Sequence, residues 1–199
     1  MNEGAVRDGG SFKEVEVIHP SAHGSPLAES GWLSPERLGA ARDSVPMVYV
    51  DAVPVRVNPV GEVVEVGLLL RMLPDGSMSR AVVSGRVLFG ERVRDALLRH
   101  LAKDLGPDAE PLLPVSVVPF TVVEYFPDHE ITGFHDPRQH AVSLAYVVPV
   151  DGPCSPSQDA LALAWVTPEE AISVALGGEM TGGQGRLVRM ALAFGAALP

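Results

Sequence analysis

Short runs of branched apolar residues, separated by turns, dominate the chain from residue 45 onward. Valine-rich runs of this kind, bounded by Gly, Pro, Asn and Asp, are typical of β-strands. The pattern predicts strands at 45–58, 62–73, 79–88, 114–126, 140–150 and 160–166. In the first of them, Pro46 and Pro54 predict an edge position or a bulge, because proline has no N–H to donate to a neighbouring strand.

Four other segments have the spacing and end signals of helices. The pattern predicts helices at 34–43, 91–106, 167–176 and 185–198. Ser34 is a suitable N-cap for the first, and Gly106 ends the second. Thr167 and Glu170 have the spacing of a capping box. The order of strands, helix, strands and helices predicts an α/β fold, a mixed sandwich with a helix on each face of a sheet.

Length and composition predict a single globular domain. The 199 residues are 46% hydrophobic and 20% charged, which is ordinary for a soluble domain that buries its own core. Residues 1–30 mix Gly, Ser, Pro and His around one short alternating piece, which predicts a flexible N-terminal tail. We therefore expect a tail at 1–30 and the folded domain at 31–199.

Charge and cysteine content exclude several classes of partner and site. A net charge of −10, with fifteen scattered basic residues, argues against nucleic acid as a partner. The single cysteine, Cys154, allows no intramolecular disulfide and favours a reducing compartment. No apolar run is long enough to cross a membrane, and the N-terminus lacks the apolar core of a signal peptide. We expect a cytoplasmic protein without a membrane partner.

The predicted helix at 91–106 has two ionisable residues on its apolar face. That face contains Val93, Ala96, Leu97 and Leu101. His100 and Asp104, one turn apart, fall within the same arc. Burying such groups costs about 1–3 kcal/mol each unless they find partners. Two explanations are open: they bond each other or nearby backbone, or they belong to a ligand site under the loop that precedes the helix.

The segment GRVLFGERVRDALLRHLAKDLG resembles the Nudix box, G-x5-E-x7-R-E-U-x-E-E-x-G-U, where U is aliphatic. The matching residues are Gly85, Glu91, Arg99, Leu101 and Gly106. The segments FHDPRQHAVSLAYVVPV and ALAWVTPEEA resemble those of Nudix hydrolases of the ADP-ribose pyrophosphatase type. Together they place residues from about 45 to 199 in the Nudix pattern, similar to a narrower group with the same altered box. The resemblance implies a Nudix-type α/β/α sandwich with a mixed sheet.

Nudix hydrolases cleave a nucleoside diphosphate linked to another moiety, with Mg²⁺ or Mn²⁺. The resemblance implies that Glu91 and Arg99 brace the box. The three metal-binding glutamates of the family fall here on His100, Lys103 and Asp104, so only Asp104 keeps a carboxylate. A lysine repels a divalent ion, and hard cations prefer oxygen to imidazole. The box is therefore degenerate in its chemical half.

Two functions stay open. The first is a Nudix-like hydrolase with an altered metal site, in which Asp104, His100 and the Gly85 carbonyl hold Mg²⁺ or Mn²⁺ and activate water. Asp104 and Asp151 are then its catalytic carboxylates, although Asp151, directly after a strand, is also a natural turn former. The second is a catalytically inactive Nudix domain that binds a nucleotide or dinucleotide as a sensor or partner module. It needs no metal, and Lys103 pairs with the phosphate instead.

Arg138, in the sequence HDPRQH, has two interpretations. It pins its loop by pairing with Asp136, or it holds a diphosphate, for which a planar guanidinium is well suited. In either functional reading the expected ligand is a nucleotide-type small molecule. A homodimer, and a purely structural role, also stay open.

Overall fold

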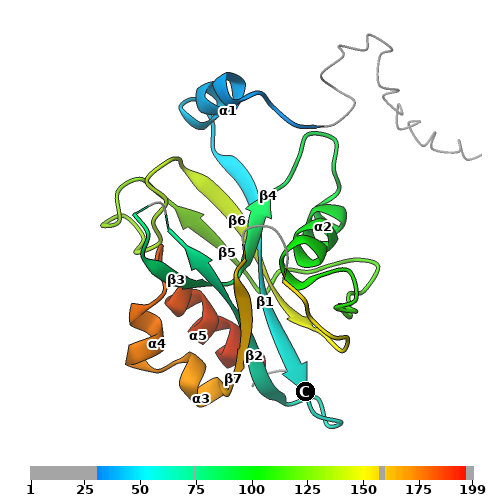
Figure 1. Ribbon diagram of the computed structural model, residues 1–199. Helices are drawn as coiled ribbons and strands as arrows, with labels where there is room; N and C mark the ends of the chain where they lie inside the picture. The colour runs from blue at the N-terminus through cyan, green and yellow to red at the C-terminus, as the bar shows by residue number, and fades with distance from the viewer. Residues whose placement is uncertain (1–30, 74, 157–159, 196–199) are drawn as a thin grey trace, which may run out of the picture.

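The computed structural model describes residues 31–73, 75–156 and 160–195, and the tail predicted at 1–30 lies outside them. A seven-stranded mixed sheet is covered by helices on both faces, which confirms the predicted α/β/α sandwich (Figure 1). The elements are α1 (Pro35–Arg42), β1 (Met47–Val57), β2 (Val63–Met72), β3 (Met78–Ala81), β4 (Val83–Arg86), α2 (Val93–Leu105), β5 (Thr121–Tyr125), β6 (Ala141–Pro149), β7 (Ala162–Val166), α3 (Pro168–Ala171), α4 (Val174–Gly178) and α5 (Gln184–Gly195).

Strand β1 lies at the centre of the sheet. The strand order is β3-β2-β1-β6-β5, with β4 also paired to β1 and β7 to β2. Among the strand pairs of the described residues, β1 and β6 alone run parallel. The edge position that Pro54 predicted for β1 is therefore wrong. Pro54 falls between Ala52, the last residue that pairs with β4, and Val55, where pairing with β2 begins, so its missing N–H interrupts neither ladder.

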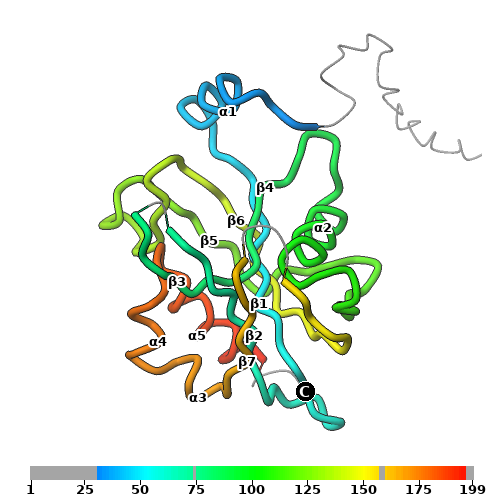
Figure 2. Tube along the Cα trace, in the orientation of Figure 1, coloured from blue at the N-terminus to red at the C-terminus, as the bar shows by residue number. Residues whose placement is uncertain are grey.

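Strands β3 and β4 bridge a split in the sheet. Only Val82 separates them, yet β3 pairs with β2 and β4 pairs with β1. The path of the chain through these strands can be followed in Figure 2. Beyond the β1–β2 hairpin the two long strands thus diverge, and residues 78–86 span the gap. Residues before and at the start of α5 support this bridge: Val82 N donates to Gln184 Oε1 at 3.0 Å, and Arg80 N donates to the Glu179 carbonyl at 2.9 Å.

The two faces of the sheet carry separate apolar cores. Along β1, Val50 packs with Leu97 of α2, whereas Val53 packs with Leu187 of α5. All four side chains are at most 1% exposed, and burying each contributes about 1.5–3 kcal/mol. Figure 1 shows α2 on one face and α3, α4 and α5 gathered on the other. Because side chains alternate between the two faces along β1, only every second residue of β1 can contact α2.

Three predicted elements are divided or much shorter in the structure. The strand predicted at 79–88 is divided at Val82 into β3 and β4. The helix predicted at 167–176 begins with the expected capping box but divides into α3 and α4. The division falls at Ser173, whose side chain accepts from Leu176 N and so caps a new helix. The strand predicted at 114–126 is reduced to β5, because Pro114 and Pro119 cannot contribute donors to a ladder.

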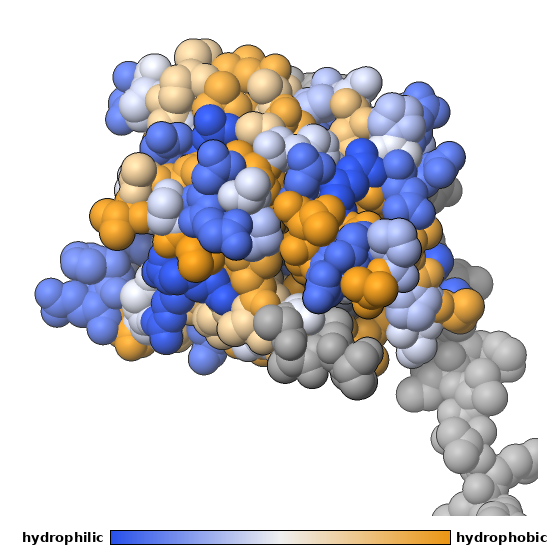
Figure 3. All heavy atoms as spheres, turned by 90° about the horizontal axis from the view of Figure 1, so that it is seen from below, coloured by the Kyte–Doolittle hydropathy of each residue, from blue (hydrophilic) through white to orange (hydrophobic). Residues whose placement is uncertain are grey.

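Within the part of the chain that the structure describes, no helix combines the length and apolar character needed to cross a bilayer. On the face shown in Figure 3, hydrophilic and hydrophobic side chains are interspersed. Exposed apolar side chains such as Val60 and Val174 lie on separate segments, and scattered residues of this kind are normal for a globular surface.

Candidate functional site

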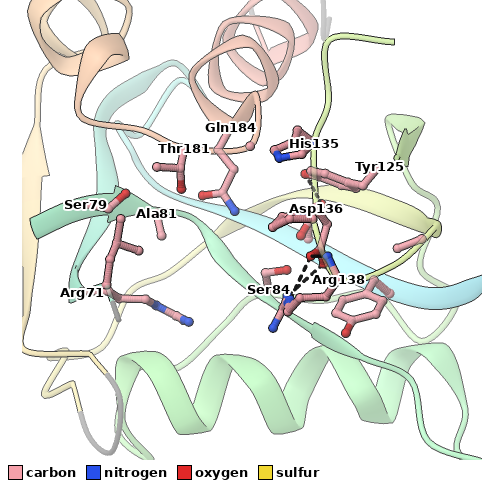
Figure 4. Close-up of a pocket in the computed structure, with 16 residues that line it drawn as sticks. Arg71, Ser79, Ala81, Ser84, Tyr125, His135, Asp136, Arg138, Thr181 and Gln184 are labelled. Carbon is pink, nitrogen blue, oxygen red and sulfur yellow. Dashed lines mark hydrogen bonds and ion pairs between the residues drawn. The ribbon is translucent and has the colours of Figure 1, made fainter. Parts of the chain in front are cut away.

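A cavity of about 520 Å³ opens where β1 and β2 diverge. Its walls come from strands β1 to β6, the loop at 135–138, and residues 181–184 before and at the start of α5. Figure 4 shows the lining side chains converging from both sides of this space. The volume is in the usual range for a small-molecule site.

Asp104, the carboxylate that the box retains, is fully buried and lies between two cations. Its Oδ2 accepts a hydrogen bond from Arg71 Nη2 at 2.7 Å, and its Oδ1 lies 3.0 Å from Lys103 Nζ. Arg71 comes from β2, so this ion pair joins the sheet to α2. A buried carboxylate left without a cation costs several kcal/mol. Arg71 and Lys103 supply that compensation here.

His100 packs directly against β4. A Cβ placed on Gly85 would lie only 1.8 Å from His100 Cε1, so the ring fits there because residue 85 is glycine. Burial lowers the pKa of His100, which favours the neutral ring, and Nε2 donates to the Arg86 carbonyl at 3.0 Å. His100 therefore bonds to the backbone through Nε2, and Asp104 pairs with cations, so the two do not bond each other; buried His100 Nδ1 has no hydrogen-bond partner among the described residues. This is the backbone-bonded explanation for His100 and an ion pair for Asp104.

The residues of the box do not fit a divalent metal ion. Among the described residues, no three His, Cys, Asp or Glu side chains gather in a metal-binding arrangement. Both oxygens of Asp104 face cations, and His100 Nε2 bonds to a carbonyl. Lys103 brings an ammonium group to the same carboxylate. The Gly85 carbonyl alone cannot replace the several oxygen ligands that Mg²⁺ requires.

Glu91, which precedes α2, and Arg99, which lies within α2, form a bidentate pair. Arg99 Nε and Nη2 donate to the two Glu91 carboxylate oxygens, each at 2.7 Å, and Leu88 N donates to Glu91 Oε2 at 2.9 Å. The bonds from Arg99 hold the pKa of Glu91 below its usual range. The same guanidinium donates to the Arg86 carbonyl at 3.0 Å. These contacts fix the loop between β4 and α2.

Arg138 is held at the opposite side of the cavity by Asp136. Its Nε and Nη2 each donate to a different Asp136 oxygen at 2.8 Å, and Gln139 Nε2 donates to the same carboxylate at 2.8 Å. Burial alone would raise the pKa of Asp136, but the bonds from Arg138 outweigh it and keep the pKa low. The pair pins its loop, and it also aims a guanidinium at the cavity.

Two guanidinium groups thus flank one space. Figure 4 shows Arg71 and Arg138 extending into the cavity from opposite sides, with Ser84 between them. Each is oriented by its own aspartate through bonds of 2.7 or 2.8 Å. Rigid guanidinium groups of this kind bind phosphate oxygens well, because their planar donors match the geometry of the anion.

A second buried aspartate, Asp51, lines the same cavity from β1. It is 1% exposed, and Tyr125 donates its hydroxyl to Asp51 Oδ2 at 2.9 Å. Burial raises the pKa of Asp51, although the nearby hydroxyls of Ser84, Ser143 and Tyr125 lower it in part. Ser143 Oγ is buried beside this carboxylate without the geometry of a hydrogen bond. The environment is polar but contributes no positive charge.

Asp151 lies away from this cavity. It follows β6 at the end opposite Ala141, which lines the cavity, and the strand between them spans about 26 Å. Asp151 is exposed, and its N–H donates to the Glu110 carbonyl at 3.3 Å. The structure therefore does not bring Asp151 together with Arg71 and Arg138.

Sequence reasoning missed Arg71 and Asp51. Both are charged residues inside apolar strand runs, in LLLRML and VYVDAVPV. A charge in such a position needs a partner or a ligand, and this signal was available from the pattern alone. Gln184, which also lines the cavity, is the first residue of α5 and lies one position before the helix predicted at 185–198.

Comparison with known proteins identifies the family to which the chain belongs. Residues 28–197 match a family model described as Domain of unknown function (DUF4916). A search of the curated proteins finds no match. A solved structure from Jonesia denitrificans DSM 20603 is 59% identical, with a TM-score of 0.75, and the match covers 78% of this chain and 98% of that one. It is described as one of the possible asymmetric diadenosine tetraphosphate hydrolases.

More distant solved structures are Nudix proteins. A NUDIX hydrolase from Nitrosomonas europaea is 13% identical, with a TM-score of 0.58 over 78% of this chain and 93% of that one. The NUDIX domain of Shewanella oneidensis NrtR, complexed with ADP-ribose, is 16% identical, with a TM-score of 0.54 over 81% and 99%. The Nudix-type fold that the box predicted is thereby confirmed.

Proposed function

Because the chain belongs to the family described as DUF4916 and has a Nudix-type fold, we propose that its cavity binds a nucleoside diphosphate linked to another moiety, and that guanidinium groups in place of a metal ion hold the diphosphate. In this role the protein is a nucleotide-binding sensor or partner module. The observation that carries the proposal is the ion pair of Arg71 with Asp104 at the edge of the cavity.

The charge balance of this cluster favours an anionic ligand. Asp104 contributes one negative charge, while Arg71 and Lys103 each contribute one positive charge. Lys103 thus offsets the carboxylate, and the guanidinium keeps a net positive charge for a phosphate. Arg71 bonds Asp104 through Nη2, and no other hydrogen bond of this side chain occurs among the described residues. Its Nε is buried, so the donors left for a ligand are those of Nη1 and the second N–H of Nη2.

The other predicted site residues take supporting roles in this proposal. Arg138 contacts the diphosphate from the far side of the cavity. Glu91 and Arg99 keep the loop before α2 rigid, and Asp104 orients Arg71. A guanidinium held ready in this way binds an oxyanion without the entropy cost of ordering a free side chain.

Hydrolysis is the second candidate, and the 59% identical relative from Jonesia denitrificans, described as a possible diadenosine tetraphosphate hydrolase, favours it. It places Mg²⁺ or Mn²⁺ at Asp104, His100 and the Gly85 carbonyl, with Asp104 and Asp151 as catalytic carboxylates. A bifunctional NMN adenylyltransferase/ADP-ribose pyrophosphatase from Francisella tularensis was solved in complex with AMP and a Mn ion. Against this candidate stands the occupation of Asp104 by two cations.

Calorimetric titration with ADP-ribose and with diadenosine tetraphosphate, in EDTA and then in Mg²⁺ or Mn²⁺, tests the proposal. We expect binding in EDTA that metal changes by less than about threefold, and no release of nucleotide products. Arg71→Met should weaken binding by about tenfold or more, because it removes a charge-assisted bond. Arg80→Met is the matched control, since Arg80 pairs with Glu179 and does not line the cavity.

Lys103→Glu separates the two candidates further. It should abolish binding in EDTA, because the cluster then carries a net negative charge toward the phosphate. Binding that requires metal in the wild-type protein, or product release that Asp104→Ala abolishes, would establish the hydrolase instead.

A further inference from the structure

Two fully buried aspartates, Asp51 and Asp104, lie at or beside the cavity, and they differ in their partners. Asp104 has a cation at each carboxylate oxygen. Asp51 has none: among the described residues, no Lys, Arg or His side chain forms an ion pair with it. Its neighbours are the neutral hydroxyls of Tyr125 and Ser84 and the backbone of central strands. The cavity is therefore bipolar, with guanidinium groups on one part of its wall and an uncompensated acid on another.

A buried carboxylate without a cation costs several kcal/mol when it ionises. Tyr125 offsets part of this cost with one hydrogen bond, but a carboxylate accepts several. Asp51 also lines the cavity, so a ligand can supply the missing donors there. A group of this kind at the wall of a cavity is a strong candidate for ligand recognition.

We infer that Asp51 determines which nucleoside the cavity accepts: its carboxylate accepts a hydrogen bond from an N–H or O–H donor on the nucleoside part of the ligand. The inference rests on the proposed function, because it assumes that Arg71 and Arg138 hold the diphosphate part. Asp51 is then a specificity-determining residue that touches the ligand, and Tyr125 positions its carboxylate.

The required donor defines the ligand chemically. A carboxylate only accepts hydrogen bonds, so a carbonyl or ether oxygen at the same place would be repelled. In a nucleoside the donors are the sugar hydroxyls and the amino groups of the base. A site built to bond such a group discriminates strongly against analogues without it, because its own polar atom is left unpaired.

The test uses calorimetric titration of the full chain with ADP and with inorganic pyrophosphate. The variant is Asp51→Asn, which keeps the shape of the side chain but removes the charge and half of its acceptor capacity. The matched control is Glu65→Gln, an exposed acid on β2 outside the cavity. We expect Asp51→Asn to weaken ADP by about tenfold or more. Pyrophosphate affinity should stay within about twofold, and Glu65→Gln should change neither ligand.

Two analogues identify the source of the donor. Inosine diphosphate has a carbonyl in place of the amino group of adenine, and 2′,3′-dideoxy-ADP lacks both sugar hydroxyls. The analogue that lacks the donor should bind the wild-type protein about as weakly as ADP binds Asp51→Asn. A urea unfolding curve of the variant provides the structural control: removing an uncompensated buried charge should leave stability unchanged or higher. A purely structural role for the carboxylate would lower it.

Four outcomes overturn the inference. The first is unchanged ADP affinity in Asp51→Asn. The second is an equal loss for ADP and pyrophosphate, which would mean that Asp51 shapes the whole cavity. The third is a folded wild-type protein that binds neither ligand, and in that case the proposed function fails with it. Pyrophosphate binding without selectivity for ADP over its two analogues would leave the proposed function standing and remove only the role of Asp51.

Discussion

Replacing Arg71 with methionine tests the cluster at the centre of the proposal. Methionine retains most of the apolar stem and removes the guanidinium, so Asp104 keeps only Lys103, 3.0 Å from Oδ1. Breaking a buried ion pair costs about 3–5 kcal/mol, and a hydrogen bond to a charged group contributes about 1.5–3 kcal/mol. Lys103 remains in the variant, and the Arg71 side chain is 25% exposed. The loss in free energy of unfolding should therefore fall below the range for a fully buried ion pair, at about 2 kcal/mol.

The assays are urea unfolding and thermal unfolding of Arg71→Met, Asp104→Asn and the double variant near neutral pH. For a chain of this size, a loss of about 2 kcal/mol corresponds to a decrease in Tm of about 4–8 °C. The interaction energy from the cycle should be about 1.5–2 kcal/mol. Arg80→Met, on the neighbouring strand β3, controls for the general loss of an arginine. Additivity within about 0.5 kcal/mol would refute the reasoning, because Asp104 would then be compensated by Lys103 alone.

Three further outcomes follow from contacts in the same structure. Gly85→Ala should destabilise the fold by about 1–3 kcal/mol, since its Cβ would meet the His100 ring, and adding His100→Ala should recover part of that loss in a thermal unfolding assay. The pKa of Asp51 is raised by burial, so its ionisation favours the unfolded chain. From about pH 4 upward to the raised native pKa, the wild type should lose stability relative to Asp51→Asn, as urea curves at several pH values would show, whereas a constant difference would contradict the assigned burial. Burial also raises the pKa of the Cys154 thiol, so a thiol reagent near pH 8 should react with it more slowly than with a free cysteine, and equal rates would contradict this.

Local patterns in the sequence predicted the elements whose structure depends on local chemistry. The inward face of α2 followed from the spacing of Leu97, Leu101 and Asp104, because a helix presents every third or fourth residue to the same side. The capping box at Thr167 was also predicted, because it joins two residues that are three positions apart in the sequence. The position of Pro54 was not, because the change of partner from β4 to β2 depends on strands that lie elsewhere in the chain.

The candidate site divides in the same way. The pairing of Glu91 with Arg99 joins two residues of one motif. By contrast, the bond from Arg71 to Asp104 joins residues 33 positions apart, and the bond from Tyr125 to Asp51 joins residues 74 apart. Contacts between residues so far apart in the sequence cannot be predicted from spacing before the order of strands is known. The sequence therefore led to the expectation of an altered box around Asp104, but not to the residue from the sheet that pairs with Asp104.

The bond between Val82 N and Gln184 Oε1 links the cavity to the last helix. Val82 lies where β3 passes into β4, so its amide belongs to neither ladder and depends on a side chain from α5 for its acceptor. Its hydrogen exchange with solvent should consequently report the opening of the C-terminal helix, and not that of the sheet around it. The ligand cavity and α5 would then open as one cooperative unit. A ligand that fills the cavity would slow amide hydrogen exchange in α5.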